Sequence, residues 1–332
     1  PNHLSVPFTR IAAEAGKSTI MINAVATGAA TALLDFKLQP VLDCIQEQFE
    51  QKGAGMIEKN QKSAAAGYDF VRQNLKAGPP FRVPSAKAVR RKMLLTGSQA
   101  MALGAMASGL KFYSGYPMSP ATTIMEFVST QADRYNIVLE QAEDEIAAIN
   151  MVIGASFAGA RAMTATSGGG FCLMVEALSL AGMTETPVVI VVAQRPGPST
   201  GLPTRTEQGD LNLVLHAGHG DFPRAVLAPG SPEQTPYLMS KAFNLADKYQ
   251  APVIVLGDQH FNDAYSTVDG LDLQGINIDH GHILTVQELP SPHEYQRYAF
   301  SETGISPRIL PGVSRAGLYA DSDEHTEEGH IT

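Results

Sequence analysis

Residues 187–193 read Pro-Val-Val-Ile-Val-Val-Ala, a stretch without charge in which five β-branched side chains follow one another. A run of this kind is typical of a strand that is buried on both faces of a sheet. Residues 252–257, Pro-Val-Ile-Val-Leu-Gly, have the same character. Parallel strands need long crossover connections, and the helical patterns between such stretches can supply them. We therefore predict an α/β fold with a parallel sheet covered by helices on both faces.

The alternation of predicted strands with predicted helices extends over residues 93–263. Shorter apolar stretches predict further strands at 110–114, 137–139, 162–165 and 225–228. Between them, apolar residues recur at helical spacing and predict helices over 98–109, 120–134, 144–160, 171–182 and 231–249. Residues 93–263 are thus predicted to form one α/β domain.

Three segments flank this domain. Residues 1–78 are predicted to form a separate unit with helices near its middle and end, whereas 18–34 fits either a strand followed by a helix or a buried helix. The Pro-rich, basic stretch 79–92 is typical of a surface linker. Residues 264–332 carry few helix signals and are predicted to form an extended segment.

Composition excludes several classes of protein. The net charge of −9 over 332 residues argues against nucleic-acid binding, which needs a basic surface. Cys44 and Cys172 are too few for a four-cysteine cluster, the histidines lack metal spacing, and no metal site is predicted. Isolated cysteines and the lack of a long apolar run predict a cytoplasmic protein without a membrane span. The start at Pro1 and the acidic end at 323–332 predict a natural chain that is longer at both ends.

Polar residues follow each predicted strand at its carboxyl end. In an open parallel sheet these ends meet at one edge, and ligands bind in the crevice there. Hydroxyl groups, carboxylates, backbone N–H groups and one Arg are therefore expected to converge. The segments that contribute them are 115–122, 140–145, 166–170, 194–201 and 258–260.

The acidic run at 143–145 has two interpretations. Acidic residues at a helix start interact favourably with the helix dipole and need no further role. Alternatively, one carboxylate is partly desolvated in a pocket and takes part in proton transfer. Asp144 and Glu145 both precede apolar helix faces, so periodicity does not choose between them.

The glycines at 168–170 and Arg195 each have two interpretations, and Cys172 has one. The glycines at 168–170 fit a backbone cradle for an anion, without a P-loop or dinucleotide-binding pattern, and fit a tight packing turn equally well. Arg195 follows a buried strand and suits either a clamp on a substrate carboxylate or a structural ion pair. Cys172 is expected to be a small buried residue of an apolar helix.

Several motifs, taken in order, resemble a known family. They are Gly-Ser-Gln-Ala at 97–100, Tyr-Pro-Met-Ser-Pro at 116–120, Glu-Asp-Glu at 143–145, Gly-Ala-Ser-Phe-Ala-Gly-Ala-Arg at 154–161, Thr-Ala-Thr-Ser at 164–167 and Arg-Pro-Gly-Pro-Ser-Thr-Gly-Leu-Pro-Thr at 195–204. This series is similar to the alpha subunit of 2-oxoacid:ferredoxin oxidoreductases. Residues 195–204 and the acidic end 323–332 most resemble the branch that acts on 2-oxoglutarate.

The resemblance implies an assignment for each part of the chain. Residues 93–263 resemble the thiamine-diphosphate pyrimidine-binding domain, and 1–78 resemble the last part of a gamma-like α/β domain. Residues 264–332 would lead to a further C-terminal domain. Thiamine diphosphate would be shared with a beta subunit that supplies magnesium and a [4Fe-4S] cluster. The implied partners are this beta subunit, ferredoxin, coenzyme A and a 2-oxoacid.

The resemblance also implies roles for individual residues. Glu145 matches the family's catalytic Glu, which hydrogen-bonds the aminopyrimidine ring, while Ser119 and Arg195 match residues at the substrate carboxylate. Cofactor contacts would come from Tyr116, Pro117, Thr166 and Ser167. The implied reaction converts 2-oxoglutarate and coenzyme A to succinyl-CoA, carbon dioxide and reduced ferredoxin. The alternatives are the same chemistry on pyruvate, branched-chain or aryl 2-oxoacids, or a non-catalytic scaffold subunit.

Overall fold

The computed structural model describes residues 3–75, 78–79, 81–84, 92–289, 295–313 and 323–331. The chain divides into two compact units, residues 1–90 and 91–332. Much of the predicted linker at 79–92 lies outside the described residues, as do parts of the predicted extended segment at 264–332. The two units are therefore described separately.

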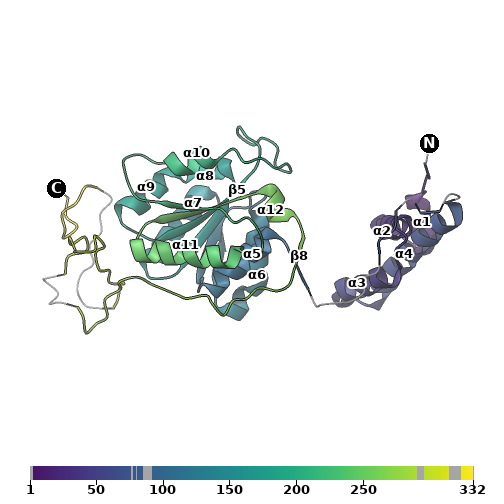
Figure 1. The fold of residues 1–332 in the computed structure, drawn as a ribbon, viewed down its shortest axis with the longest axis horizontal. Helices are drawn as coiled ribbons and strands as arrows, with labels where there is room; N and C mark the ends of the chain where they lie inside the picture. Colours follow the sequence, from purple (N-terminus) through teal and green to yellow (C-terminus); the bar gives the residue numbers. More distant parts are fainter. Residues whose placement is uncertain are drawn as a thin grey trace. The chain divides into compact units, whose positions relative to one another are not determined.

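The first unit is built from helices (Figure 1). They are α1 (Phe8–Ala15), α2 (Ile22–Leu33), α3 (Gln39–Phe49) and α4 (Ala54–Asn74). For 18–34 the buried helix is the correct alternative, because a 3-10 turn leads directly into α2. Helices α2 and α4 pack closely where Gly28 lacks a side chain, since a Cβ there would lie 1.8 Å from the Ala64 carbonyl oxygen. Among its described residues this part of the predicted second α/β domain contributes helices and no strand.

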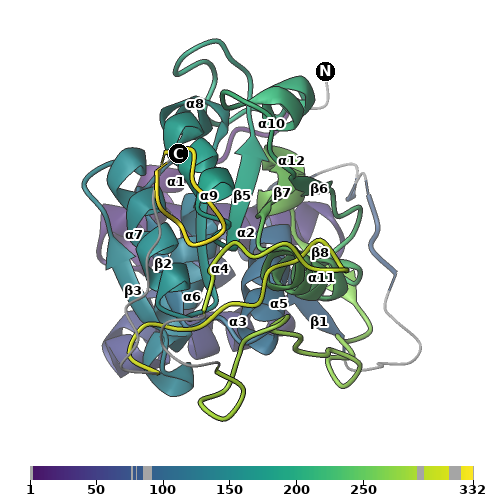
Figure 2. The same cartoon turned by 90° about the vertical axis from the view of Figure 1, so that its left-hand side faces the viewer.

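The second unit contains a six-stranded parallel sheet of order β3-β2-β4-β5-β7-β6, which can be followed from left to right in Figure 2. The two apolar stretches become the central neighbours β5 (Val188–Gln194) and β7 (Pro252–Asp258), paired from Val188 opposite Pro252 onward. The remaining strands are β2 (Phe112–Gly115), β3 (Val138–Gln141), β4 (Ala162–Thr166) and β6 (Ala225–Leu227). This arrangement confirms the predicted fold class.

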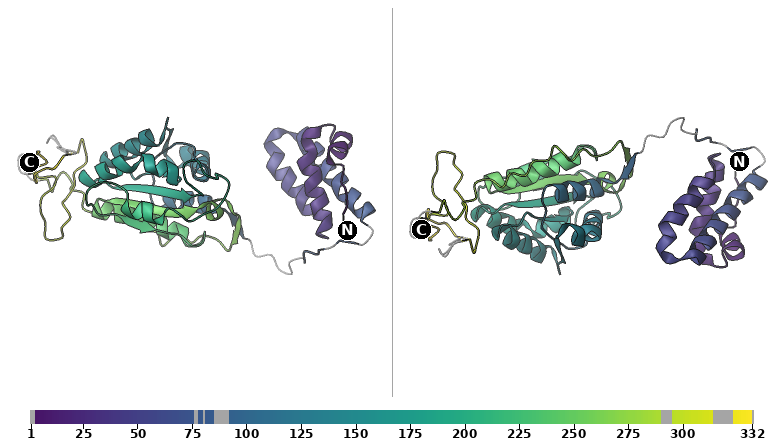
Figure 3. Two further views of the ribbon diagram at one scale, coloured as in Figure 1. Left: turned by 90° about the horizontal axis from the view of Figure 1, so that it is seen from above. Right: turned by 90° about the horizontal axis from the view of Figure 1, so that it is seen from below.

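Helices cover both faces of the sheet, as the edge-on views of Figure 3 show. One face carries α5 (Gly97–Ala107), α6 (Thr122–Tyr135) and α11 (Thr235–Tyr249), and the other carries α7 (Glu145–Phe157), α8 (Gly168–Leu173), α9 (Val175–Met183) and α10 (Leu211–His216). Along β5, Val189 and Val191 face the first layer, whereas Ile190 and Val192 face the second. Alternate side chains of a strand point to opposite faces, so a strand buried on both must be apolar throughout.

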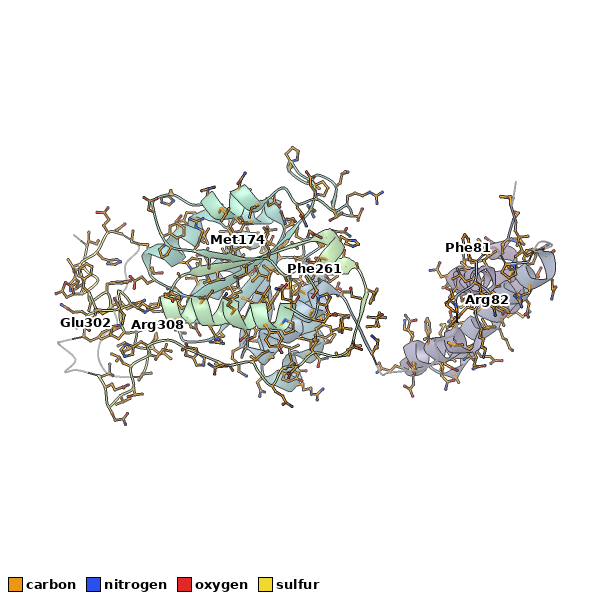
Figure 4. All side chains as sticks on the ribbon, viewed as in Figure 1. Phe81, Arg82, Met174, Phe261, Glu302 and Arg308 are labelled. Atoms are coloured by element: carbon orange, nitrogen blue, oxygen red, sulfur yellow. The ribbon has the colours of Figure 1, made fainter. Side chains whose placement is uncertain are left out.

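Two details of the α/β unit differ from the predicted elements. The helix predicted over 171–182 is interrupted at Met174, which lies between α8 and α9 and is fully buried under them (Figure 4). A second, two-stranded sheet pairs β1 (Met93–Leu95) antiparallel with β8 (Ser266–Val268), close to the short helix α12 (Gln259–Asp263). The sequence pattern predicts neither β8 nor α12, because both are very short.

The segment after β8 is held to the domain by buried charges. Among its described residues it contains isolated bridges but no helix. Arg161, just before β4, is almost fully buried, and its Nε lies 2.8 Å from Asp247 Oδ2 on α11. The same guanidinium group donates hydrogen bonds to the carbonyl oxygens of Ser108 and Asp279. Arg161 therefore joins α5, α11 and the extended segment.

Candidate active site

Three loops meet at the carboxyl edge of the sheet. The loop after β2 contacts the loop after β5, because Arg195 Nη1 donates a hydrogen bond of 2.7 Å to the carbonyl oxygen of Ser119. It also contacts the turn after β4, because the hydroxyl groups of Thr166 and Ser167 both donate to the sulfur of Met118. The predicted convergence of these segments at one edge is therefore present in the structure.

Asp144 and Glu145, left as alternatives by periodicity, have different roles in the structure. Asp144 is the N-cap of α7, and its Oδ1 accepts a hydrogen bond of 2.7 Å from the backbone N–H of Ala147. This bond satisfies one of the free N–H groups at the helix start. Glu145 is the first residue of the helix and is only 2% exposed. The helix start thus explains Asp144 by its cap bond, whereas Glu145 lies in the first turn, where the helix dipole also favours an acid, and is buried.

The Glu145 carboxyl group lies against the glycine turn that follows β4. A Cβ placed on Gly170 would be 2.5 Å from Glu145 Oε1 and 2.0 Å from Thr166 Oγ1. Tight packing therefore accounts for a glycine at this position. Glu145 Oε1 is buried and has no hydrogen-bond partner among the described residues. A buried polar atom without a partner carries an energetic cost, which a bound ligand would relieve.

The electrostatic environment favours a proton on Glu145. Burial raises the pKa of its carboxyl group above the ordinary value of 4.5, and the neighbouring charge of Asp144 acts in the same direction. Backbone hydrogen bonding, the charge of Arg195 and the Thr166 hydroxyl oppose this shift but do not cancel it. A carboxyl group whose pKa moves toward neutrality is suited to proton transfer.

The other predicted site residues divide by exposure. Tyr116 and Ser119 are exposed, and Pro117 is half-buried. Thr166 and Ser167 are fully buried, so their hydroxyl groups belong to the wall of the site.

Arg195 is half-buried, and its charge acts on the Glu145 carboxyl group. Its alternative role, a structural ion pair, is not formed with any residue in the described part of the chain. Among the described residues its guanidinium group makes one hydrogen bond, from Nη1 to the Ser119 carbonyl oxygen. The remaining N–H groups of the fork can therefore serve a ligand.

Two residues complete this edge: Gln194, which falls in the predicted segment 194–201, and Asp210, which sequence reasoning missed. Gln194, the last residue of β5, donates through Nε2 to the Gly257 carbonyl oxygen and accepts through Oε1 from the Asp210 N–H, at 2.9 Å. Asp210 Oδ2 is buried without a partner among the described residues, and a Cβ on Gly168 would lie 2.4 Å from it. The one available signal was an acidic residue in the long loop after a buried strand.

Asp258 and Cys172 have simpler explanations. Asp258 ends β7, caps α12 by accepting from the Phe261 N–H, and accepts from Gln208 Nε2 at 2.5 Å, so it ties the loop after β5 to the sheet. Cys172, expected to be buried, is exposed on α8. That prediction was wrong because α8 is a short helix at the sheet edge whose outer face is uncovered.

Metal-binding and membrane-spanning features are likewise not found in the described ranges. Within them, no group of three or more His, Cys, Asp and Glu residues is arranged to hold a metal ion. No helix there has both the length and the apolar character needed to cross a bilayer.

Two family models match the chain. The model described as "Pyruvate flavodoxin/ferredoxin oxidoreductase, thiamine diP-bdg" covers residues 103–332, and "Pyruvate ferredoxin/flavodoxin oxidoreductase" covers residues 1–70. The chain belongs to the pyruvate flavodoxin/ferredoxin oxidoreductase family. The α/β unit, with Glu145 at its sheet edge, is thus the thiamine-diphosphate-binding domain of this oxidoreductase family.

Relatives within the oxidoreductase family agree with the match. The chain is 42% identical over 317 residues to the 2-oxoacid:ferredoxin oxidoreductase 1, subunit alpha, of Sulfurisphaera tokodaii, covering 90% of this chain and 48% of that protein. It is 47% identical over 166 residues to the 2-oxoglutarate synthase subunit KorA of Archaeoglobus fulgidus, covering 50% of this chain and 48% of the relative. The chain therefore spans about half the length of these relatives.

A solved structure in the oxidoreductase family has the same fold. It is the 2-oxoglutarate:ferredoxin oxidoreductase from Magnetococcus marinus, with 2-oxoglutarate, coenzyme A and succinyl-CoA bound. The TM-score is 0.84 at 38% identity, over 98% of this chain and 56% of the other.

The residues at the sheet edge fit thiamine diphosphate. An aminopyrimidine ring offers nitrogen atoms that need hydrogen-bond partners, and Glu145 Oε1 is a buried oxygen that lacks one. The oxygen lies against the main chain of Gly170, with the Thr166 hydroxyl group beside the same glycine.

Proposed function

We propose that this chain is part of the alpha subunit of an oxidoreductase that converts 2-oxoglutarate and coenzyme A to succinyl-CoA and carbon dioxide. The two electrons released pass singly to ferredoxin. The observation that carries the proposal is the buried Glu145 side chain, whose Oε1 has no hydrogen-bond partner among the described residues, at the edge where parallel sheets bind ligands. The names of the relatives and of the Magnetococcus marinus enzyme support 2-oxoglutarate as the substrate.

Glu145 is the proposed catalytic residue. When bound, thiamine diphosphate supplies a nucleophilic carbon for attack on the 2-oxo group. Glu145 hydrogen-bonds a pyrimidine nitrogen and holds or releases the proton there, for which its raised pKa is suited. Thr166, whose hydroxyl lies at the same turn, limits how far this carboxyl group can move.

Arg195 and Ser119 are the proposed substrate-binding residues. The hydrogen bond from Arg195 Nη1 to the Ser119 carbonyl oxygen holds the guanidinium group beside the main chain of Ser119. A guanidinium fork matches a carboxylate in two hydrogen bonds, and a hydroxyl adds a third donor. Tyr116, Pro117, Thr166 and Ser167 are proposed to line the cofactor site.

A beta subunit is proposed to complete the enzyme. In the assignment that the family resemblance implies, that partner holds the [4Fe-4S] cluster and the magnesium for the diphosphate. In the same assignment, residues 1–78 end a gamma-like domain, 93–263 bind the pyrimidine, and 264–332 lead toward a further domain. A cytoplasmic location remains a prediction from the cysteine content.

The test of the substrate uses the assembled alpha–beta enzyme with coenzyme A and ferredoxin. Ferredoxin reduction is measured with 2-oxoglutarate, pyruvate, a branched-chain and an aryl 2-oxoacid. We expect the highest kcat/KM with 2-oxoglutarate. A preference for another acid would overturn the substrate, and no turnover of any acid would overturn the enzymatic function in favour of a scaffold.

The test of the catalytic residue is Glu145→Gln in the same complex. Loss of a proton-transfer group is expected to lower kcat by about 10²–10⁴-fold, where each decade corresponds to about 1.4 kcal/mol of barrier. Glu143→Gln, an exposed acid two residues earlier, is the matched control and should keep full activity. Near-normal turnover by an assembled Glu145→Gln enzyme would contradict the assignment.

A further inference from the structure

Two consecutive carbonyl oxygens in the loop after β2 are held by different elements. The Ser119 carbonyl oxygen accepts a hydrogen bond from Arg195 Nη1, on the loop after β5. The next carbonyl oxygen, that of Pro120, accepts from Thr123 Oγ1 at 3.0 Å, in the first turn of α6. The main chain directly after Ser119 is therefore fixed at two successive peptide groups.

The Thr123 hydroxyl group belongs to a network of three polar side chains, named here the Ser98 network. Thr123 Oγ1 lies 2.7 Å from Ser98 Oγ, which accepts a hydrogen bond of 3.1 Å from Asn262 Nδ2. Ser98 and Asn262 are both fully buried. A carbonyl oxygen only accepts, so the single hydroxyl proton of Thr123 goes to Pro120 and the Ser98 hydroxyl donates to Thr123. Every donor of the Ser98 network is thus directed toward the loop after β2.

The start of α5, which carries Ser98, is held firmly against α12. A Cβ on Gly97 would lie 2.3 Å from the Phe261 carbonyl oxygen, so only glycine permits this approach. Thr96 and Gln99 form a capping box that fixes the first turn of α5. These contacts account for the residues on either side of Ser98, whose own hydroxyl group bonds outward to α6 and α12.

Helix α12 is also tied to the loop that carries Arg195. Its N-cap, Asp258, accepts hydrogen bonds from Gln208 Nε2 at 2.5 Å and from Thr206 Oγ1 at 3.4 Å. The loops that carry Ser119 and Arg195 are therefore linked twice. The Arg195–Ser119 hydrogen bond links them directly, and the Ser98 network links them through α6, α5 and α12.

We propose that Thr123 and Ser98 are positioning residues, which fix the loop of Ser119 relative to Arg195 for binding of the 2-oxoacid. The inference rests on the proposed function, because it takes these two residues as the substrate-binding pair. Thr123 and Ser98 act through the main chain at Pro120 and do not themselves contact the ligand. Without the Ser98 network, the Pro120 carbonyl oxygen loses its donor, the loop gains freedom, and the 2-oxoacid binds less tightly.

The test compares Thr123→Val with Thr123→Ser in the assembled alpha–beta enzyme. Valine keeps the shape of threonine without its hydroxyl group, whereas serine keeps the hydroxyl group. In Thr123→Val, KM for 2-oxoglutarate should rise about three- to tenfold, with kcat and the KM for coenzyme A nearly unchanged. Thr123→Ser should restore the wild-type KM. A fall of kcat alone would indicate a merely structural role and overturn the proposal, as would an unchanged KM.

Thr130→Val is the matched control for the loss of a threonine hydroxyl group. The Thr130 hydroxyl group lies on the same helix and donates to the Phe127 carbonyl oxygen, within α6 itself. Its removal should leave both KM values at the wild-type level. A rise of KM for 2-oxoglutarate as large as that of Thr123→Val would contradict the proposal, because it would show that any such loss in α6 disturbs the site.

Ser98→Ala tests whether the hydroxyl groups act together. It should raise the same KM, and the double variant with Thr123→Val should be no worse than the weaker single variant, because both substitutions interrupt one network. Additive effects on KM would contradict the Ser98 network. If Thr123→Val does not assemble, Ser98→Ala compared with Thr130→Val decides the matter.

Hydrogen–deuterium exchange over residues 115–122 provides a readout that needs no turnover. Exchange should be faster in Thr123→Val and Ser98→Ala than in wild type and Thr130→Val, and equal rates would contradict the proposal. Wild-type turnover with an unchanged KM in the Thr123 and Ser98 variants would overturn this inference alone. Absence of wild-type turnover with every 2-oxoacid would instead overturn the proposed function.

Discussion

The Glu145 carboxyl group rests on the main chain of Gly170, so closely that a Cβ at 170 would come within 2.5 Å of Oε1. A CαH₂ group is no conventional hydrogen-bond donor, which explains why a buried carboxyl oxygen stays unpartnered. The contact holds the acid in place and gives its oxygen no conventional donor on the Gly170 side.

Gly170→Ala is expected to remove activity while leaving the sheet intact. The new methyl group would displace both Glu145 and Thr166, and a displacement of about 1 Å at a reacting group costs about 100-fold in rate. Gly169→Ala is the matched control, because a Cβ there meets nothing nearer than the Ser199 carbonyl oxygen at 3.6 Å. Steady-state kinetics of both assembled variants checks this, and equal rates would refute the contact.

Glu145→Gln is expected to stabilise the protein at neutral pH. Burial raises the pKa of Glu145 in the folded state above 4.5, so the folded chain binds more protons than the unfolded chain. The stability of the fold therefore falls as pH rises from the unfolded pKa through the folded pKa. The Gln side chain does not ionise, so the variant does not lose stability with pH for this reason. Thermal unfolding over a pH series should show a smaller decline for Glu145→Gln than for wild type. Parallel curves would show that the carboxyl group is not held protonated.

Arg195→Lys is expected to raise KM for 2-oxoglutarate by about tenfold or more. Lysine keeps the charge but cannot both donate to the Ser119 carbonyl oxygen and grip a carboxylate with a planar fork. Arg134→Lys, in the last turn of α6, controls for the substitution itself and should leave KM unchanged. An unaltered KM in Arg195→Lys would remove Arg195 from the substrate site.

Arg161→Met is expected to destabilise the α/β unit by about 3–5 kcal/mol, because it leaves Asp247 charged and buried. The Ser108 and Asp279 carbonyl oxygens also lose their donor. Lys92→Met breaks the exposed pair with Asp269 and should cost below about 1 kcal/mol. Chemical unfolding of the two variants checks the difference, and equal losses would mean that Arg161 does not secure the extended segment.

The central strands were predictable because burial on both faces leaves an unmistakable apolar run, as at 188–192. The break at Met174 was not predictable, because α8 and α9 both bury apolar side chains at helical spacing. Strand β8 is three residues long and depends on pairing with β1, far away in the sequence. Tertiary contacts of that kind leave no local pattern.

The site residues, like the strands and helices, were only partly predictable from the sequence. Residues at or shortly after the carboxyl ends of strands, such as Ser119, Thr166 and Arg195, were predicted to share an edge because topology alone brings them there. The choice between Asp144 and Glu145 needed the cap bond to Ala147, which periodicity does not encode. Asp210 needed the path of a long loop, and that path depends on the side chain of Gln194.

The pairing of Met93 with Val268 and Leu95 with Ser266 brings the first and last strands of the α/β core side by side. Both flanking segments leave the ladder at its Met93–Val268 end, so pulling them apart would open this short ladder pair by pair before it could distort the parallel strands. The core is attached to its surroundings as an inserted module would be, so a circularly permuted chain that joins these ends should keep the architecture of the sheet.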